Sequence, residues 1–414
     1  MKEWLSWQEQ CHVKEIDLGL ERVSSVYRRL KRNPLTPIYT ITVAGTNGKG
    51  SCVSMLECIL LKAGYRVGVY STPHLLRYNE RIRLNGRTVE DELITASFER
   101  IDKARQETSL SYFEFGTLAA LDIFSHQNID IQILEVGLGG RLDAVNIIDA
   151  DAALITSIDV DHVDWLGDDK SVIALEKAGV FRPRQKAVCG DKTVPESLVN
   201  YANSLGTDLI RAGKDFNYQI NRDDWCLTAE HSLAGTYPMP ALKGAHQIQN
   251  AAAVISLLAH IKDDVTVTNE NIDAGLREVF LAGRLQQLSS QPDVFLDVAH
   301  NAESATVLAD FIKTRTIAGR VHAVFSILAD KDINKVITPF IGLVDHWHIA
   351  PLSVPRSQSL DVMNDLLGKK LAQNCSNYES IKVAFKRATE AANKDDLVIC
   401  FGSFYVVEAC LDAL

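Results

Sequence analysis

The stretch VAGTNGKGSCVSMLECIL, residues 43–60, carries a glycine-rich loop that departs twice from the common P-loop pattern G-x-x-x-x-G-K-[ST]. Its first glycine comes three residues before Gly48, and Gly50 separates Lys49 from Ser51. Glycines permit left-handed backbone and the close approach of a ligand, and Lys49 adds a positive charge for the β- and γ-phosphates of a nucleotide. The loop alone leaves two interpretations open: a nucleotide loop of unusual spacing, and a strand-to-helix turn without a ligand.

The segments on either side of the loop favour the nucleotide interpretation. Residues 38–44 are apolar and β-branched, residues 51–63 have the apolar spacing of a helix, and residues 66–72 have the pattern of a second strand. Such a βαβ unit requires parallel strands and a right-handed crossover. It also directs backbone N–H groups and the helix dipole at an anion. If Gly50 lets the helix begin one residue later, the Ser51 hydroxyl still reaches Mg²⁺.

Composition indicates a soluble globular protein. The chain has 414 residues, enough for two or three domains, and 46% of them are hydrophobic. The net charge of −10 argues against nucleic acid or an anionic membrane as the main partner. The eight cysteines form no CxxC pair and are expected to be buried free thiols. The N-terminus MKEWLSWQEQ has no apolar signal core, and no apolar run reaches ~18 residues, so we expect a cytoplasmic protein.

The rest of the chain alternates between strand and helix patterns, as expected for a buried parallel sheet. Strands are expected at 131–137 and 152–158, and helices near 114–126, 171–180 and 246–261. Residues 207–243 are alternating and rich in turns, which suits a small antiparallel patch. After the polar segment 283–293 the βα rhythm restarts.

This organisation predicts an α/β protein with two domains. Residues 1–285 are expected to form a P-loop ATPase domain with a parallel sheet and the antiparallel patch. Residues 286–291 are expected to be a linker, and residues 292–414 a smaller Rossmann-like α/β domain.

Polar residues follow the predicted strands of the first domain, at the sheet edge where ligands of open parallel sheets gather. Thr72 ends the second strand, and Glu135 lies near the end of the next. The segment DVDHVDWLG places Asp159, Asp161 and His162 at a further strand exit. Thr72, Glu135 and His162, with Ser51, offer hydroxyl, carboxylate and imidazole groups, which suit Mg²⁺ or Mn²⁺. A glutamate at a strand end is also a common capping residue, and a lone histidine is often structural; the P-loop beside them favours a metal site.

Eight segments in order give the chain a resemblance to a known family. They are TVAGTNGKGS, YSTPHLLRYNERIRLNG, YFEFGTLAAL, LEVGLGGRLDAVNI, TSIDVDHVDWLG, ALEKAGVF, AGRLQ and FLDVAHN. Together they resemble the bacterial bifunctional dihydrofolate synthase/folylpolyglutamate synthase family, which belongs with the Mur ligases. The resemblance covers nearly the whole chain and implies that the displaced glycine is this family's own form of the loop.

The resemblance implies an ATP-dependent amide ligase. In such an enzyme ATP phosphorylates a carboxylate of 7,8-dihydropteroate or of a reduced folate, and the amine of L-glutamate attacks the acyl phosphate. It also implies two magnesium ions, which Mn²⁺ can replace, small-molecule partners without nucleic acid or membrane, and a monomer.

By the same resemblance, the nucleotide, the metal ions and catalysis are assigned to specific residues. The ATP-binding residues would be Thr46, Asn47, Gly48, Lys49, Gly50, Ser51, Asn250, Arg284, Asp297 and His300. The metal ligands would be Ser51, Thr72, Glu135, His162 and Lys177, and the catalytic residues Lys49, His162 and Lys177. Lys177 matches a lysine that is carbamylated in this family; taken alone, it has the pattern of a solvated helix lysine.

The acceptor is assigned to three further segments. They contain Glu15, Ile16, Asp17, Leu18, Ser111, Tyr112, Phe113, Glu114, Leu142, Asp143 and Ala144. Phe113 could pack on the flat pterin or aminobenzoyl ring, although core packing is the ordinary role of such aromatics. The segment 15–18 favours the bifunctional enzyme over one that only extends folates.

Two other interpretations remain open at this point. One is a neighbouring ligase, either a monofunctional folylpolyglutamate synthase or a cell-wall amino-acid ligase; about 37 residues precede the first strand, too few for the additional domain of a wall ligase. The other is a P-loop ATPase switch without ligase chemistry. Asn250, Arg284 and Asp297, on both sides of the predicted linker, argue against a switch.

Overall fold

The computed structural model describes residues 1–14, 17–30, 37–371 and 375–414. These residues divide into two compact units. The first comprises Met1–Ala241 and Gln247–Val279, and the second comprises Leu242–His246 and Phe280–Leu414.

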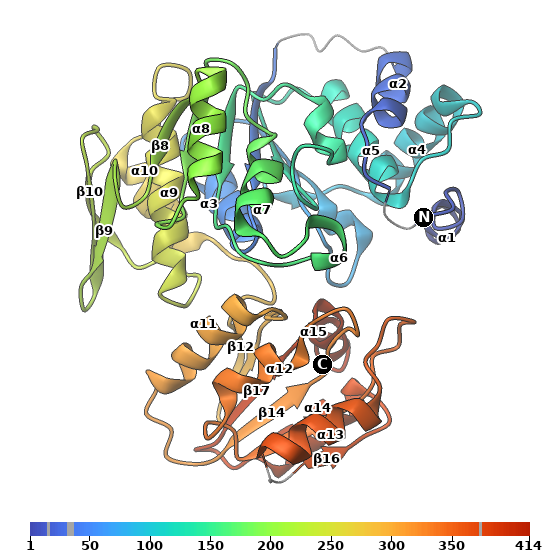
Figure 1. Ribbon diagram of the computed structural model, residues 1–414, viewed down its shortest axis with the longest axis vertical. Coiled ribbons are helices and arrows are strands. Elements are labelled where there is room, and N and C mark those ends of the chain that lie inside the picture. The colour runs from blue at the N-terminus through green and yellow to red at the C-terminus, as the bar shows by residue number, and fades with distance from the viewer. Residues whose placement is uncertain (15–16, 31–36, 372–374) are drawn as a thin grey trace. The chain divides into compact units, whose positions relative to one another are not determined.

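The first unit contains the P-loop and alternates strands with helices, with a short ribbon before its last helices (Figure 1). Its strands are β1 (Tyr39–Ala44), β2 (Val67–Tyr70), β3 (Ile82–Leu84), β4 (Arg87–Thr88), β5 (Ile131–Glu135), β6 (Ala152–Ile155), β7 (Lys186–Cys189), β8 (Asp208–Arg211), β9 (Phe216–Ile220), β10 (Asp224–Ala229) and β11 (Gly235–Pro238). Its helices are α1 (Lys2–Gln8), α2 (Glu21–Leu30), α3 (Lys49–Lys62), α4 (Asp91–Arg105), α5 (Tyr112–His126), α6 (Val163–Leu166), α7 (Lys170–Ala178), α8 (Glu196–Leu205), α9 (His246–His260) and α10 (Asn269–Glu278), with 3₁₀ turns η1 (Tyr78–Arg81) and η2 (Ala144–Ile147). The first residue of α9 belongs to the second unit.

The main sheet of the first unit confirms the predicted βαβ unit. Its strand order is β4-β3-β2-β5-β1-β6-β7-β8, and every pair from β2 to β8 is parallel. The P-loop strand β1 therefore lies between β5 and β6, with Val43 opposite Glu135 and Leu154. This register brings the carboxyl ends of the three strands to one edge, beside the P-loop.

Helices cover both faces of this sheet. On one face α3 packs against β1, β2 and β5, and α10 packs on α3. The opposite face meets α5, whose Phe115 and Phe124 share a core with Leu134 and Ile155. Neighbouring strand residues point to opposite faces, so near-continuous apolar strands are buried on both sides.

The antiparallel patch differs in part from its prediction. The ribbon β11-β10-β9 is antiparallel, as expected for residues 207–243. The first strand of that segment, β8, instead pairs in parallel with β7 and ends the main sheet. Alternation along β8 is compatible with either sheet, because an edge strand leaves one face to solvent.

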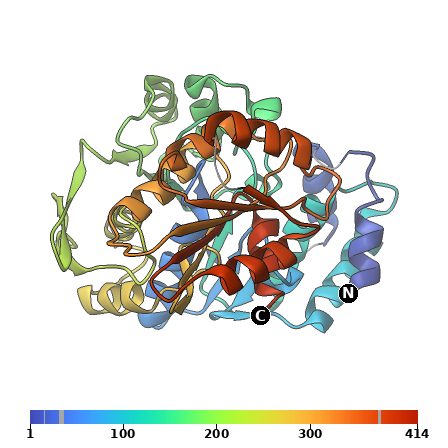
Figure 2. The same cartoon turned by 90° about the horizontal axis from the view of Figure 1, so that it is seen from below.

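The second unit is a smaller α/β fold (Figure 2). Its strands are β12 (Gln286–Ser290), β13 (Asp293–Leu296), β14 (Val321–Phe325), β15 (His346–Ile349), β16 (Cys375–Asn377) and β17 (Leu397–Phe401). Its helices are α11 (Ala302–Lys313), α12 (Ile333–Ile337), α13 (Leu360–Leu371), α14 (Ile381–Ala391) and α15 (Phe404–Leu411), with the 3₁₀ turn η3 (Thr338–Phe340). The sheet order is β12-β13-β17-β14-β15-β16, parallel except for β12, with helices on both faces.

The predicted linker differs from the structure. Most of residues 286–291 form β12, which pairs antiparallel with β13 at the sheet edge. Its polar composition suits an edge strand as well as a linker, because one side of such a strand faces water. The compact units divide instead near Val279 and Phe280.

No helix in the described ranges combines the length and the apolar character that a bilayer span requires.

Candidate nucleotide site and acceptor region

The P-loop turns sharply into α3 at Gly48. Gly48 is the N-cap residue and has φ 85°, in the left-handed region where a side chain is strained. The helix begins at Lys49, two residues before the start at Ser51 that the sequence pattern indicates, so the expectation that it starts after Gly50 is wrong. The left-handed turn is made at Gly48, and Gly50 lies in the first helical turn. Ser51 follows in that turn and is buried.

The segment that follows β6 holds the P-loop in place, a role that was not predicted from the sequence. The Thr46 backbone N–H donates to Ser157 O over 2.8 Å, and the Asn47 N–H donates to Ser157 Oγ over 3.0 Å. Thr156 Oγ1 donates to Asn47 O over 2.6 Å. The Thr46 hydroxyl also donates to Asp159 O and accepts from the Asp159 N–H. Small hydroxyl residues at a strand exit are the available signal, because they can satisfy the polar backbone of a tight loop.

Asn250, predicted to bind ATP, lies against the P-loop. A Cβ on residue 48 would come within 2.5 Å of Asn250 Oδ1. Asn250 Nδ2 donates to Gln247 Oε1, and Gln247 Nε2 donates to Ser51 Oγ over 3.2 Å. Helix α9 thus presents two buried amides to the first turn of α3, and the glycine at position 48 leaves the room they require.

A pocket opens directly beside this loop. It is lined by Gly45, Thr46, Lys49, Gly137, Leu138, Gly139, Asp161, His162, Leu166 and Lys177. Lys49 Nζ donates to Gly45 O over 2.9 Å and to Thr46 O over 3.1 Å, so its charge lies over the loop. The structure therefore brings the three predicted catalytic residues, Lys49, His162 and Lys177, to the wall of one pocket.

Lys177 is 3% exposed, near the end of α7. Burial, reinforced by the positive charge of Lys49, lowers the pKa of Lys177 to about 7, against the opposing effect of Asp161. A substantial fraction of this amine is therefore uncharged at neutral pH. The solvated-lysine interpretation does not fit a side chain in this position.

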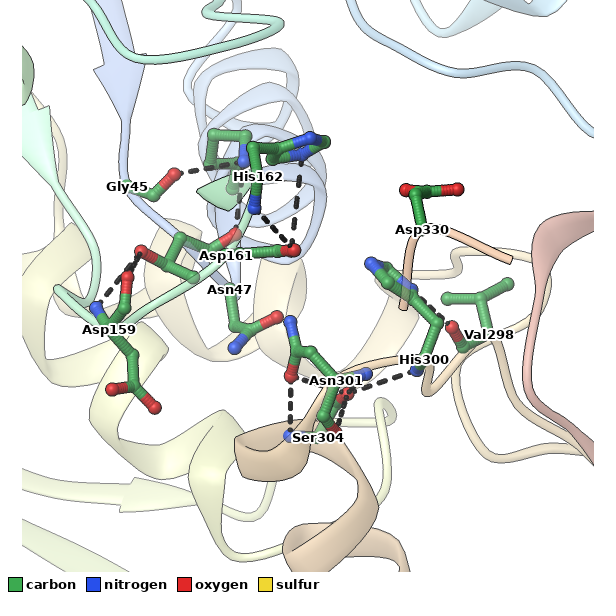
Figure 3. Close-up of polar contacts among 12 residues, drawn as sticks. Gly45, Asn47, Asp159, Asp161, His162, Val298, His300, Asn301, Ser304 and Asp330 are labelled. Carbon is green, nitrogen blue, oxygen red and sulfur yellow. Dashed lines mark hydrogen bonds and ion pairs between the residues drawn. The ribbon is translucent and has the colours of Figure 1, made fainter. Parts of the chain in front are cut away.

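His162 and Asp161 form one side of the pocket (Figure 3). His162 has φ 52° and precedes α6; its backbone N–H donates to Asp161 Oδ1 over 2.8 Å, and its Nε2 lies 3.9 Å from Asp161 Oδ2. The imidazole is held next to a carboxylate while its backbone adopts an uncommon conformation, which is more frequent at functional sites than in ordinary turns.

The other predicted metal ligands meet at the ends of β2 and β5. The Thr72 N–H donates to Glu135 Oε2 over 3.1 Å, and Glu135 is 3% exposed. Over the described part of the chain, no three His, Cys, Asp or Glu side chains lie close enough together to hold a metal ion by themselves. Hydroxyl groups beside one or two carboxylates fit magnesium, which typically completes its octahedral shell with water and substrate phosphates.

In the second unit, Asp297 follows β13 and ties its loop together. Asp297 Oδ2 accepts from the Leu285 N–H and Oδ1 accepts from the Ala299 N–H, both over 2.8 Å. Burial raises the pKa of Asp297, whereas Arg284 and the two N–H donors oppose that rise. The Arg284 guanidinium lies 5.2 Å from the Phe404 ring centroid, so Arg284, Asp297 and Phe404 form one cluster.

His300 and Asn301 occupy the loop between β13 and α11 (Figure 3). His300 Nδ1 lies 2.8 Å from Val298 O, and its ring lies 6.1 Å from that of Phe404. Asn301 caps α11 by accepting from the Ser304 N–H over 3.0 Å. The three ATP-binding residues predicted here, Arg284, Asp297 and His300, thus cluster at one strand end of the second unit.

The predicted acceptor residues 111–114 form the N-terminus of α5. Ser111 and Glu114 form a reciprocal capping box, in which Glu114 Oε2 accepts from the Ser111 N–H over 2.8 Å. A Cβ on Gly137 would approach the Phe113 ring to 2.7 Å, so Phe113 packs directly on the loop that follows β5. Tyr112 lies under the Arg81 guanidinium, 5.4 Å from its ring centroid.

Asp143 closes the loop opposite Phe113. Its Oδ2 accepts from the Gly137 and Leu138 N–H groups, and its Oδ1 accepts from the Val145 N–H. Burial raises the pKa of Asp143 to about 6 in spite of these donors. Ala144, next to it, is buried. Asp143 and Glu114 both organise backbone, which is a structural function for two residues assigned to the acceptor.

The remaining acceptor residues belong to the N-terminal segment. Asp17 and Leu18 are half-buried, and the Gly19 N–H donates to Leu142 O over 3.3 Å. Glu15 and Ile16 lie outside the described residues.

Family models match both units. Residues 43–258 match the Mur ligase middle domain, and residues 283–404 match the Mur ligase glutamate ligase domain. A strand–P-loop–helix unit followed by a second α/β unit is therefore the arrangement of an amide ligase of this class.

The relatives narrow the family further. The dihydrofolate synthase/folylpolyglutamate synthase of Escherichia coli K12 is 42% identical over 411 residues, covering 99% of this chain and 94% of the relative. The structure of E. coli FolC in complex with DHPP and ADP has a TM-score of 0.92 at 42% identity, covering 99% of this chain and 96% of that one. A bifunctional folylpolyglutamate synthase/dihydrofolate synthase with Mn, AMPPNP and L-glutamate bound has a TM-score of 0.90 at 41% identity, covering 100% and 97%. The chain belongs to the dihydrofolate synthase/folylpolyglutamate synthase family of Mur ligases.

Proposed function

We propose that the chain is an ATP-dependent amide ligase that joins L-glutamate to 7,8-dihydropteroate and to reduced folates. The observation that carries the proposal is the pocket of Lys49, His162 and Lys177 beside the P-loop, in a chain that matches such synthases along its whole length. ATP and glutamate are cytoplasmic metabolites, so we place the enzyme in the cytoplasm.

The proposed reaction has two steps. A carboxylate oxygen of the acceptor attacks the γ-phosphorus of ATP, forming an acyl phosphate and releasing ADP. The glutamate nitrogen then attacks the acyl carbon; the carbon–oxygen bond to phosphate breaks, the nitrogen loses a proton and an amide results. Phosphorylation is needed because a carboxylate is a poor electrophile, and the enzyme's contribution is positioning and charge neutralisation.

The residues of the first unit would divide this work. Residues 46–49 would hold the phosphates. The Thr46 and Asn47 N–H groups already donate to Ser157, so the backbone N–H groups at the start of α3 would face the phosphates. Lys49 would turn from its loop carbonyls toward the β- and γ-phosphates. Ser51, Thr72, Glu135 and His162 would hold magnesium. A bound divalent ion would neutralise charge on the transferring phosphoryl group.

Lys177 would act as a carbamate. Its neutral amine would attack carbon dioxide, and the nitrogen would lose a proton. A buried side chain that can carry a positive charge would thus become an anion. A pKa of about 7 supports this assignment, because only the uncharged amine has a lone pair to donate. The buried anion would then face Lys49 and the metal site instead of opposing them.

Phosphate release tests the function. The enzyme would receive ATP, magnesium and L-glutamate with either 7,8-dihydropteroate or a reduced folate as acceptor. Release with both acceptors is expected. Release with the folate alone would leave a monofunctional folylpolyglutamate synthase, and ATP hydrolysis that needs neither acceptor nor glutamate would contradict a ligase.

A further inference from the structure

Arg22 joins two elements that meet in the acceptor region. It lies in the first turn of α2, which packs beside α4 and α5 in the first unit (Figure 1). Its Nη1 lies 2.6 Å from Asp17 Oδ2, and its Nη2 donates to Asp17 O over 2.8 Å. The same Nη2 donates to Glu114 Oε1 over 3.1 Å. One guanidinium therefore fastens the N-terminal segment to the capping box of α5.

The Asp17 carboxylate is engaged from three directions. His12 Nε2 lies 3.0 Å from Asp17 Oδ2, Lys14 Nζ donates to Oδ1 over 3.4 Å, and Arg22 binds as described. His12 Nδ1 in turn lies 3.0 Å from Ser109 Oγ, two residues before the N-cap of α5. The hydrogen bond from His12, helped by Arg22 and Lys14, lowers the pKa of Asp17. Asp17 is thus an ionised anchor between α2 and the start of α5.

The same segment touches the opposite wall of the acceptor region. The Gly19 N–H donates to Leu142 O over 3.3 Å, within the loop that Asp143 closes against Phe113. Residues 17–19 therefore contact both structures assigned to the acceptor: the N-terminus of α5 and the loop of residues 137–144. A shift of this segment would move both contacts together.

We propose that Arg22 is a positioning residue for the pterin acceptor, and that Asp17 serves as its anchor without contacting the acceptor. This inference rests on the proposed function. The planar guanidinium presents N–H groups to Asp17 and Glu114 at the same time, a geometry that the single ammonium of lysine does not reproduce. Glu114 is 2% exposed, so loss of Arg22 would also leave a buried carboxylate without its cation.

The test separates positioning from general stability by comparing two arginines of one helix. Arg22→Gln and Asp17→Asn remove the anchor. Arg29→Gln is the matched control, because Arg29 ties the other end of α2 to the carbonyls of Ala104 and Arg105 after α4. KM for 7,8-dihydropteroate, KM for ATP, kcat and the melting temperature are measured for each variant.

A positioning role predicts a selective effect. Arg22→Gln and Asp17→Asn should raise KM for the acceptor about tenfold, with kcat and KM for ATP within about twofold of the unmodified chain. Arg22→Lys should restore part of the loss, and Arg29→Gln should change only the melting temperature. If Arg22→Gln fails to fold, Arg22→Lys and Asp17→Asn decide the same question.

Two results would overturn the inference, and they are distinguishable. Equal acceptor KM in the Arg22 and Arg29 variants, or a loss confined to kcat, would show that Arg22 has no part in acceptor positioning while the proposed function stands. Absence of acceptor-dependent phosphate release in the unmodified chain would overturn the proposed function, and this inference with it.

Discussion

The β1–α3 connection of the first unit and the β13–α11 connection of the second are built on the same plan but end differently. Each leads from a strand inside a mostly parallel sheet, through a short loop, into the N-terminus of a helix. In the second, the N-cap Asn301 accepts from the Ser304 N–H with its own side chain. In the first, the N-cap is Gly48, which has no side chain to offer. Equal topology therefore does not make equal sites; the cap residue determines whether the helix supplies its own acceptor.

The two loops also differ in the sign of the charged side chain that lies on their backbone. The second loop contains its own anion, since Asp297 accepts from two backbone N–H groups. The first loop contains a cation, Lys49, whose Nζ lies on two loop carbonyls. The fixed charge of the second loop is an anion that accepts from backbone N–H groups, whereas that of the first loop is a cation on backbone carbonyls. A cation beside a helix N-terminus is the arrangement that suits a phosphate.

The largest expected effect comes from removing the cation of the first loop. Lys49→Ala should lower kcat/KM about a thousandfold, because the transferring phosphoryl group would lose the positive charge that neutralises it. Lys62→Ala, at the other end of α3, is the control for helix stability. Steady-state phosphate release and thermal melting measure both. Loss of the cooperative melt in Lys49→Ala would assign the lysine to the fold.

The buried carboxylate at the end of β5 is expected to have the next largest effect. Glu135→Gln keeps the shape but removes the charge, so activity at limiting magnesium should fall roughly thirtyfold and recover partly at high magnesium. Asp130→Asn, which precedes β5 and pairs with Arg66, is the control. A magnesium titration unchanged by Glu135→Gln would reject the metal role.

The cap of α3 gives a third test. Gly48→Ala places a Cβ in the left-handed region and within 2.5 Å of Asn250 Oδ1. Stability should fall by about 1–2 kcal/mol, and KM for ATP should rise about tenfold. Gly64 has φ 87° with open space around its Cβ position, so Gly64→Ala carries the backbone strain without the clash. An identical KM for ATP in both variants would mean that contact with Asn250 is unimportant.

Each unit contains a buried basic side chain with a lowered pKa, but the two side chains have different surroundings. Lys177 lines a pocket, whereas His348 lies within the second unit beside Tyr378 and two further histidines, His322 and His346. Burial, then the charges of His346 and His322, lowers the pKa of His348 from 6.5 to about 3. A lowered pKa by itself therefore does not mark a functional site.

The histidine cluster predicts the pH dependence of the second unit. Because the native pKa of His348 lies below its unfolded value, the unfolded state binds more protons between pH 6.5 and about 3. Stability is thus complete above about pH 6.5 and should fall by about 2 kcal/mol between pH 7 and pH 5. Hydrogen exchange of β14 and β15 at the two pH values measures it, with His348→Phe expected to flatten the profile and His260→Gln to leave it unchanged. Equal profiles for His348→Phe and the unmodified chain would contradict the assignment.

The smallest effect is expected at the N-cap of α11, where Asn301 accepts a hydrogen bond with its own side chain. Asn301→Ala should cost about 1 kcal/mol of stability, because the Ser304 N–H loses its acceptor. Denaturant unfolding measures this. Asn301→Asp, which keeps an acceptor, should be close to neutral, and an equal loss in both variants would show that the cap contributes little.

The sequence by itself determined the fold class and the nucleotide loop. Strands 38–44 and 66–72 around a glycine turn could be predicted because period, β-branching and turn chemistry are local properties. The position of Glu135 follows from the strand register, because parallel pairing of β1 with β5 places Glu135 at the P-loop edge of the sheet. The boundaries of α3, β8 and β12 could not be predicted, because a left-handed glycine and an edge strand leave ambiguous local patterns.

Only the tertiary structure decided what each polar side chain does. Lys177 has the pattern of a surface helix lysine, and only packing buries it beside Lys49 and lowers its pKa. Asp17 and Glu114 are both carboxylates in segments assigned to the acceptor, and only the fold shows that Arg22 binds both, although Glu114 lies 92 residues after Arg22 in the sequence. Local sequence patterns determine backbone preference. Desolvation and charge pairing depend on contacts between segments that are distant in the chain, so they cannot be predicted from the pattern of a single sequence.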